Sequence, residues 1–188
     1  MPILKKEDDI YPLDLLVADN EFVDQDSQKS WWCIYTISRR EKELARQLTK
    51  LRIAHYCPTI EKRYRSPKGR IRTSFIPLFA NYLFFYGSNE DRFEAMKSNC
   101  ISKYYPIEDP DQLVGDLRKI KTMVESGVPL TPESRLESGD RVRVKTGPFA
   151  KYEGTVIRRD GKTRLLIAIE FLEQGVSMEI DEGLLAVV

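Results

Sequence analysis

The stretch that decides the fold reads Ile76-Pro77-Leu78-Phe79-Ala80-Asn81-Tyr82-Leu83-Phe84-Phe85-Tyr86. It is the most apolar and aromatic run of the 188 residues and carries no charge. Because side chains alternate along a strand, Tyr82, Phe84 and Tyr86 belong to one face, and Leu83 and Phe85 belong to the other. A strand that is apolar on both faces is buried on both, or is buried on one and docks a partner with the other.

A strongly basic region lies directly before this stretch. Residues 39–72 carry twelve basic and three acidic side chains, a local net charge of +9, although the whole chain has a net charge of +1. Such asymmetry is typical of a nucleic-acid or acidic-protein surface. A charged helix face alone is usually just solvated, but here a basic hairpin follows it. The candidate nucleic-acid-binding residues are Arg39, Lys42, Arg46, Lys50, Lys62, Arg63, Arg65, Lys68, Arg70 and Arg72.

The elements around the aromatic stretch predict an α+β domain over residues 30–126. A capping-box pattern at Ser38–Glu41 indicates the start of a helix, and Asp109-Pro110 indicates the start of another. Alternating strands and helices of this kind predict an antiparallel sheet flanked by helices. Strands are expected at residues 31–37, 55–64, 71–77, 81–86 and 102–107, and helices from about residue 39, at 88–99 and up to 126.

The remaining segments differ in composition. Residues 1–29 are acidic and aperiodic, which predicts a mobile tail; a fold-back of this tail onto the basic region is the electrostatic hypothesis for its role. Residues 127–138 contain two prolines and no periodicity, which predicts a linker. Residues 139–188 contain five short predicted strands with glycine turns, which indicates a small barrel.

The composition offers no catalytic, metal or cofactor site. The three cysteines are widely spaced, His55 is the single histidine, and there is no glycine-rich phosphate loop. No apolar run reaches the roughly 20 residues of a membrane span, and the acidic N-terminus does not fit a secretory signal. We therefore expect a cytoplasmic, monomeric protein that is not an enzyme.

Two parts of the sequence resemble one known family. Residues 139–144 (GDRVRV) and 147–156 (GPFAKYEGTV) resemble a KOW motif. Residues 30–32 (SWW) and 77–84 (PLFANYLF) resemble the N-terminal domain of NusG-type transcription elongation factors. Both stretches occur in the family's domain order, across residues 30–188. The resemblance implies an α+β N-terminal domain followed by a small all-β SH3-like KOW barrel.

This resemblance implies a non-catalytic transcription elongation or antitermination factor. In the family, a hydrophobic face of the N-terminal domain grips the clamp helices of the largest RNA polymerase subunit. Large aromatic side chains suit such an interface, although each of them has an alternative place in the core. The matching positions are Trp31, Phe79, Tyr82 and Phe84, with Tyr56 nearby as a fifth candidate.

One departure from the family pattern points to a specialised paralogue similar to RfaH. General factors usually have Pro-Gly before the tyrosine, whereas this chain has Ala80-Asn81 before Tyr82. In the specialised paralogues the same domain reads the non-template DNA strand, so the resemblance implies non-template DNA as a partner of the basic residues.

The KOW region resembles domains that bind a ribosomal protein or the termination factor Rho. Its candidate partner-binding residues are Phe149, Tyr152, Phe171 and Leu172. The family's Gly-Arg pair is replaced near residues 172–175, which leaves both partners open. The alternative function is a ribosome-associated or RNA-binding KOW protein that does not act on polymerase. The eight basic and eight acidic residues of positions 139–188 argue against it.

Overall fold

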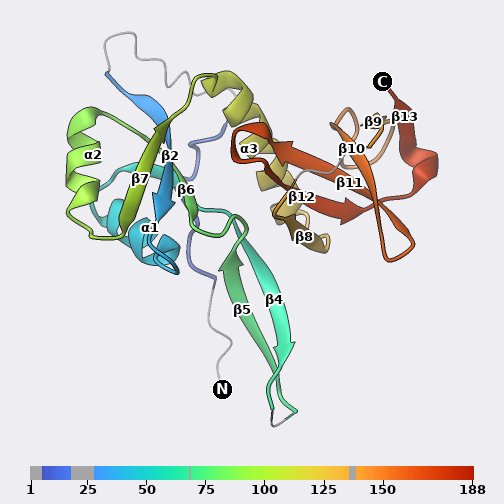
Figure 1. The fold of residues 1–188 in the computed structure, drawn as a ribbon, viewed down its shortest axis with the longest axis horizontal. Coiled ribbons are helices and arrows are strands. Elements are labelled where there is room, and N and C mark those ends of the chain that lie inside the picture. Colours follow the sequence, from blue (N-terminus) through green and yellow to red (C-terminus); the bar gives the residue numbers. More distant parts are fainter. Residues whose placement is uncertain (1–5, 18–27, 68, 136–138) are drawn as a thin grey trace. The chain divides into compact units, whose positions relative to one another are not determined.

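The computed structural model describes residues 6–17, 28–67, 69–135 and 139–188, which fall into two compact units, Met1–Pro110 and Asp111–Val188 (Figure 1). The N-terminal unit contains a five-stranded antiparallel sheet in the order β1-β3-β6-β2-β7. Its strands are β1 (Ile10–Tyr11), β2 (Ser30–Thr36), β3 (Ala54–Tyr56), β6 (Tyr82–Gly87) and β7 (Ile101–Pro106).

Helices α1 (Glu41–Lys50) and α2 (Asn89–Met96) pack on one face of this sheet. Leu44 and Leu48 of α1 are fully buried in the same cluster as Leu83 and Phe85 of β6. The predicted alternation of β6 is therefore confirmed on this face. Phe84 lies between them in sequence and points to the opposite face.

The two predicted helix starts have different outcomes. At α2 the capping box is present, because Ser88 and Asp91 each accept a hydrogen bond from the other's backbone N–H. At α1 the expected capping box is wrong: Arg39 has a φ of +63°, the helix begins at Glu41, and Arg40 makes no side-chain cap bond. The Glu41 carboxylate is instead buried and accepts a hydrogen bond from the backbone N–H of Asn81 at 2.7 Å.

The strand expected at residues 55–64 is two strands. The first, β3, ends at Tyr56, and β4 (Thr59–Arg65) begins after Pro58, which has no N–H to give to a ladder. Strand β4 lies outside the five-stranded sheet and, among the described strands, pairs with β5 alone (Ile71–Pro77). The two strands form a hairpin that projects from the N-terminal unit (Figure 1).

The expectation of a mobile tail at residues 1–29 is wrong for residues 6–17. Ile10 and Tyr11 form β1, which pairs with Tyr56 and His55 at the edge of the sheet. Ile10, Leu15 and Leu16 are buried, so this acidic segment contains enough apolar surface to pack. Residues 1–5 and 18–27 lie outside the described part of the chain.

The C-terminal unit contains α3 (Pro110–Glu125) and a six-stranded antiparallel sheet in the order β13-β9-β10-β11-β12-β8. Short 3-10 helices lie at Glu170–Leu172 and Glu182–Leu184. The strands are β8 (Leu130–Glu133), β9 (Arg141–Val144), β10 (Glu153–Arg159), β11 (Lys162–Ile169), β12 (Gln174–Glu179) and β13 (Leu185–Val187).

The predicted domain boundary differs from the observed division. The expected linker contains β8, which pairs with β12, and the Glu133 carboxylate accepts a hydrogen bond from Ser177 at 2.6 Å. Helix α3 also groups with the C-terminal unit rather than with residues 30–109. Residues 136–138 of the predicted linker lie outside the described residues.

The five strands expected after residue 139 are all present. The Asp160-Gly161 turn joins β10 to β11 with positive φ at both residues, +50° and +73°, as a tight hairpin requires. Gly154 has a different role: a Cβ atom there would lie 2.4 Å from the Leu166 carbonyl oxygen. Only glycine therefore allows β10 and β11 to approach this closely.

Candidate functional site

The predicted nucleic-acid-binding residues lie on α1, at its start and on the β4–β5 hairpin, all in the N-terminal unit. Eight of the ten are exposed and Lys42 is half-buried. Lys68, at the hairpin tip, lies outside the described residues. Thus the basic side chains that the structure describes reach solvent from two neighbouring elements.

The register of the hairpin divides its side chains between two faces. Tyr64 pairs with Arg72, and Lys62 pairs with Ser74, on one face. Partners across an antiparallel pair project to the same side, so Lys62, Tyr64 and Arg72 share this face and all are exposed. Among the described residues, no acidic side chain forms an ion pair with Lys62 or Arg72. We call Lys62, Tyr64 and Arg72 the ribbon face.

The opposite face of the hairpin has a different chemistry. Arg63 forms an ion pair there with Glu61, and Arg65 lies opposite the exposed Ile71. Tyr64 was not among the sequence candidates. Its place two residues after Lys62 in the same strand was the signal that could have found it, but only the register puts Arg72 on the same face.

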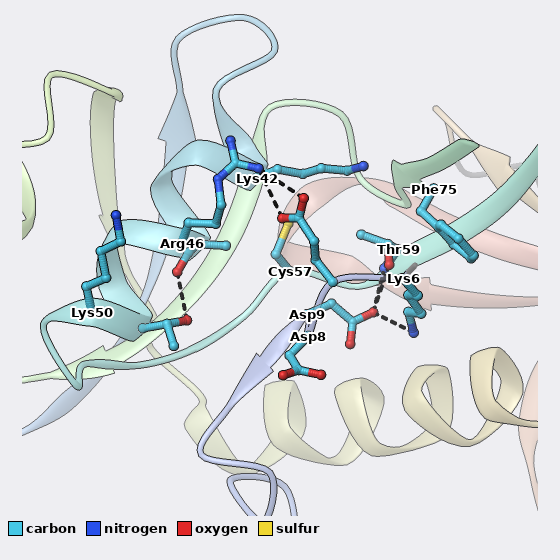
Figure 2. Close-up of a pocket in the computed structure, with 12 residues that line it drawn as sticks. Lys6, Asp8, Asp9, Lys42, Arg46, Lys50, Cys57, Thr59 and Phe75 are labelled. Atoms are coloured by element: carbon cyan, nitrogen blue, oxygen red, sulfur yellow. Dashed lines mark hydrogen bonds and ion pairs between the residues drawn. The ribbon is translucent and has the colours of Figure 1, made fainter. Parts of the chain in front are cut away.

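A pocket of about 510 Å³ lies beside α1 and the base of the hairpin (Figure 2). Lys42, Arg46 and Lys50 line it from α1, and Cys57, Thr59 and Phe75 line it from β3–β5 and the connection between them. Burial raises the pKa of the Cys57 thiol to about 12, so this part of the wall is neutral. The wall from α1 is therefore cationic, and the wall from Cys57, Thr59 and Phe75 is uncharged.

The acidic N-terminal segment lines a further side of the pocket through Lys6, Glu7, Asp8 and Asp9. Both carboxylate oxygens of Glu7 accept hydrogen bonds from Nη1 of Arg46, at 3.1 and 3.0 Å. The hypothesis that this segment folds back on the basic region is thus confirmed for Glu7.

Asp9 fixes the same segment to the start of β4. Its carboxylate accepts hydrogen bonds from the backbone N–H of Thr59 at 3.1 Å and from Thr59 Oγ1 at 2.9 Å. Its carbonyl oxygen accepts a hydrogen bond from the Cys57 N–H at 2.7 Å. No local sequence pattern predicts these contacts, which join residues about fifty positions apart.

Four of the five predicted polymerase-binding side chains are in the interior. Trp31 is 7% exposed, Tyr56 and Phe79 are each 1% exposed, and Phe84 is fully buried. The rings of Phe79 and Phe84 meet edge to face at 6.1 Å. As exposed contacts these four assignments are corrected, because each of these side chains is buried.

Tyr82 is the member of the set that remains half-buried. Its ring packs against Tyr35 of β2, with the ring centroids 5.1 Å apart. Burial raises the pKa of the Tyr82 hydroxyl, so this group stays neutral. At the start of β6, the two tyrosines form a small surface that combines apolar rings with hydrogen-bonding hydroxyl groups.

Asn81 adopts a left-handed conformation with a φ of +67°. Its carbonyl accepts a hydrogen bond from Thr36 at 2.7 Å while its N–H donates to Glu41. Glycine and asparagine are the residues that tolerate this conformation best. The Ala80-Asn81 sequence therefore satisfies the same backbone requirement as a glycine.

Residues 29–128 match the family model described as "NusG: Transcription termination factor nusG". The chain belongs to the NusG family. A comparison with curated protein sequences gives no match. A solved structure described as "Crystal Structure of MjSpt4:Spt5 complex conformation B" is 16% identical, with 84% of this chain and 96% of that chain covered and a TM-score of 0.28. The family assignment therefore rests on the sequence match.

The NusG-family match begins after the N-terminal segment of residues 6–17. Strand β1, Asp9 and the Glu7–Arg46 ion pair thus add contacts from outside the matched region to the NusG-family domain. The candidate partner-binding residues 149, 152, 171 and 172 lie beyond the match as well.

Two of these four C-terminal residues are accessible. Phe149 and Leu172 are buried, and Phe149 packs on Tyr152 with the ring centroids 5.7 Å apart. Tyr152 is half-buried and Phe171 is exposed. The apolar surface available to a partner here is therefore smaller than expected.

The described residues of this NusG-family chain contain no group of three or more side chains placed to hold a metal ion. Cys33, Cys57 and Cys100 are free and buried. Among the helices in the same part of the chain, none is long and apolar enough to cross a membrane.

Proposed function

We propose that this protein is a non-catalytic transcription elongation or antitermination factor. Its N-terminal unit binds RNA polymerase and contacts the non-template DNA strand. The observation that carries the proposal is the ribbon face within a NusG-family domain. It presents an exposed tyrosine and two cations that form no ion pair with any described residue.

The ribbon face suits single-stranded nucleic acid. Lys62 and Arg72 can neutralise phosphates, and Tyr64, 46% exposed, can stack on a base. Proteins that bind single strands combine these two contacts, cationic grooves and aromatic platforms. The opposite face has part of its charge neutralised by Glu61, so we assign the DNA contact to one side of the hairpin.

We expect the double variant Lys62→Ala and Arg72→Ala to bind single-stranded DNA more weakly. If both side chains contact phosphate, the slope of log affinity against log salt falls by roughly 1.4, since each single-strand contact contributes about 0.7. Titration of a fluorescent oligothymidine at several salt concentrations, followed by anisotropy, measures both quantities in the full chain.

The matched control is Arg63→Ala with Arg65→Ala. It removes the same charge from the other face of the same hairpin. Equal losses from the two double variants would contradict a DNA contact on one face. A wild-type affinity that does not depend on salt would remove the DNA contact altogether.

The polymerase contact is assigned to Tyr82 and its neighbour Tyr35. Both lie on the sheet face opposite α1 and α2, which also carries Phe84, and register places Lys103 opposite Tyr35 on the adjacent strand. Aromatic side chains at such positions often provide the largest part of an interface. The four buried aromatic side chains, Trp31, Tyr56, Phe79 and Phe84, instead pack in the interior and stabilise the fold.

Tyr82→Ala is expected to weaken binding to core RNA polymerase by at least about thirtyfold, corresponding to the roughly 2 kcal/mol of an interface hot spot. A pull-down with purified core polymerase measures the change, and a melting curve checks that the variant is folded. Phe93→Ala removes an exposed aromatic from α2 and should bind normally. Unchanged binding by Tyr82→Ala would reject this site.

For the C-terminal unit we propose a KOW domain that recruits a ribosomal protein or Rho through Tyr152 and Phe171. The specialised, RfaH-like role is also part of the proposal. Asn81 meets a backbone requirement that glycine also meets, so this residue alone does not separate a specialised factor from a general one. The test is the set of genes on which the protein acts. Genome-wide occupancy limited to a few operons supports the specialised role, and occupancy on all genes contradicts it.

A further inference from the structure

Three basic side chains of α1 line the cationic side of the pocket in Figure 2, and they differ in whether they form an ion pair. Lys42, Arg46 and Lys50 recur every four residues, so they lie along one face of α1. Arg46 holds the carboxylate of Glu7. No ion pair with Lys42 or Lys50 is present in the part of the chain that the structure describes.

Glu7 and Asp9 contribute to this site in different ways. The Asp9 side chain is 14% exposed and is held by the N–H and hydroxyl groups of Thr59. The Glu7 and Arg46 side chains are each 53% exposed, and their ion pair faces solvent. Glu7 can therefore leave Arg46 by rotating its side chain, while Asp9 and β1 stay in place.

The free energy of such an exposed ion pair is small. Solvent screening and side-chain entropy limit pairs of this kind, so a second anion can compete with Glu7 for Arg46. A competing anion also reaches two further cations, Lys42 and Lys50, which form no ion pair with the residues that the structure describes. A chain of phosphates suits three cations along one helix face better than one carboxylate does.

We infer that this pocket is a phosphate-binding site in which the carboxylate of Glu7 occupies the place of a nucleic-acid phosphate. Single-stranded DNA displaces Glu7 from Arg46 and then contacts Lys42 and Lys50 as well. The anchored segment of residues 6–9 thus lowers the affinity of the α1 face for DNA. The inference rests on the proposed DNA-binding function and adds a competing residue from outside the matched family region.

The test is a double-mutant cycle on the full-length chain, with a fluorescent oligothymidine as the probe. Glu7→Gln is expected to bind it about two- to fivefold more tightly at low salt, the range for loss of one exposed ion pair. The gain should shrink as salt is raised. Arg46→Ala should weaken binding, and in its presence Glu7→Gln should give no gain.

Glu94→Gln is the matched control, because it breaks the exposed Glu94–Lys97 ion pair on α2 and removes the same charge from the same unit. An equal gain from Glu94→Gln would show a general charge effect and overturn the inference. So would an unchanged affinity of Glu7→Gln when the wild type binds. Absence of binding by the wild type and all variants would instead reject the proposed DNA-binding function itself.

Discussion

Phe84→Ala is expected to lower the free energy of unfolding of the N-terminal unit by about 3–5 kcal/mol, the usual cost of removing a buried phenylalanine ring. Phe84 is fully buried, pairs with Cys33 and Tyr56 across the sheet, and contacts Phe79 edge to face. The smaller side chain would leave a cavity in the centre of β6, where rigid neighbours on three strands limit collapse.

Tryptophan fluorescence can follow this unfolding selectively. Both tryptophans of the chain, Trp31 and Trp32, lie in β2 of the N-terminal unit. Denaturant titration of the full chain therefore reports on the unit that contains Phe84. The shift in midpoint, at an unchanged slope, gives the loss of stability.

Phe93→Ala is the control for the same chemical change at an exposed site. Phe93 is 61% exposed on α2, so its loss is expected to cost less than about 0.5 kcal/mol. Equal, small effects of the two variants would contradict the burial of Phe84. In that case Phe84 would again be available to polymerase, as the family resemblance implied.

Asp9→Ala is expected to lower the free energy of unfolding of the N-terminal unit by about 1–3 kcal/mol. The variant leaves the N–H of Thr59, a buried residue, without its acceptor, and an unsatisfied buried donor costs about this much. It also loosens β1, whose Ile10 is buried against β3. The same fluorescence-detected titration measures the change.

Asp8→Ala tests whether charge alone explains such an effect. Asp8 is the exposed neighbour of Asp9 and loses the same negative charge, yet no described residue hydrogen-bonds to its side chain. Its expected effect is within about 0.5 kcal/mol. If Asp8→Ala and Asp9→Ala were equally mild, the contact with Thr59 would contribute nothing, and residues 6–17 would behave as the tail that their composition suggested.

Much of the fold could be predicted because its signals are local. The alternation of β6, the capping box at Ser88 and the Asp160-Gly161 turn each depend on residues a few positions apart. The start of α1 could not be predicted in this way. Glu41 is held by the backbone of Asn81, forty residues later, and that contact exists only after the sheet has formed.

The features of the candidate site also fall into two groups: those that the sequence predicts and those that only the structure shows. The sequence alone determined where the basic residues are concentrated and that β6 has two apolar faces. It also determined that residues 30–32, 77–84, 139–144 and 147–156 resemble NusG-family motifs. Composition, periodicity and motifs are properties of the chain itself. Only the tertiary structure decided that Phe84 is buried, that Lys62, Tyr64 and Arg72 share a face, and that Glu7 reaches Arg46. Burial, strand register and ion pairing depend on what lies opposite a residue in space, and alternation within one strand carries no information about its neighbour.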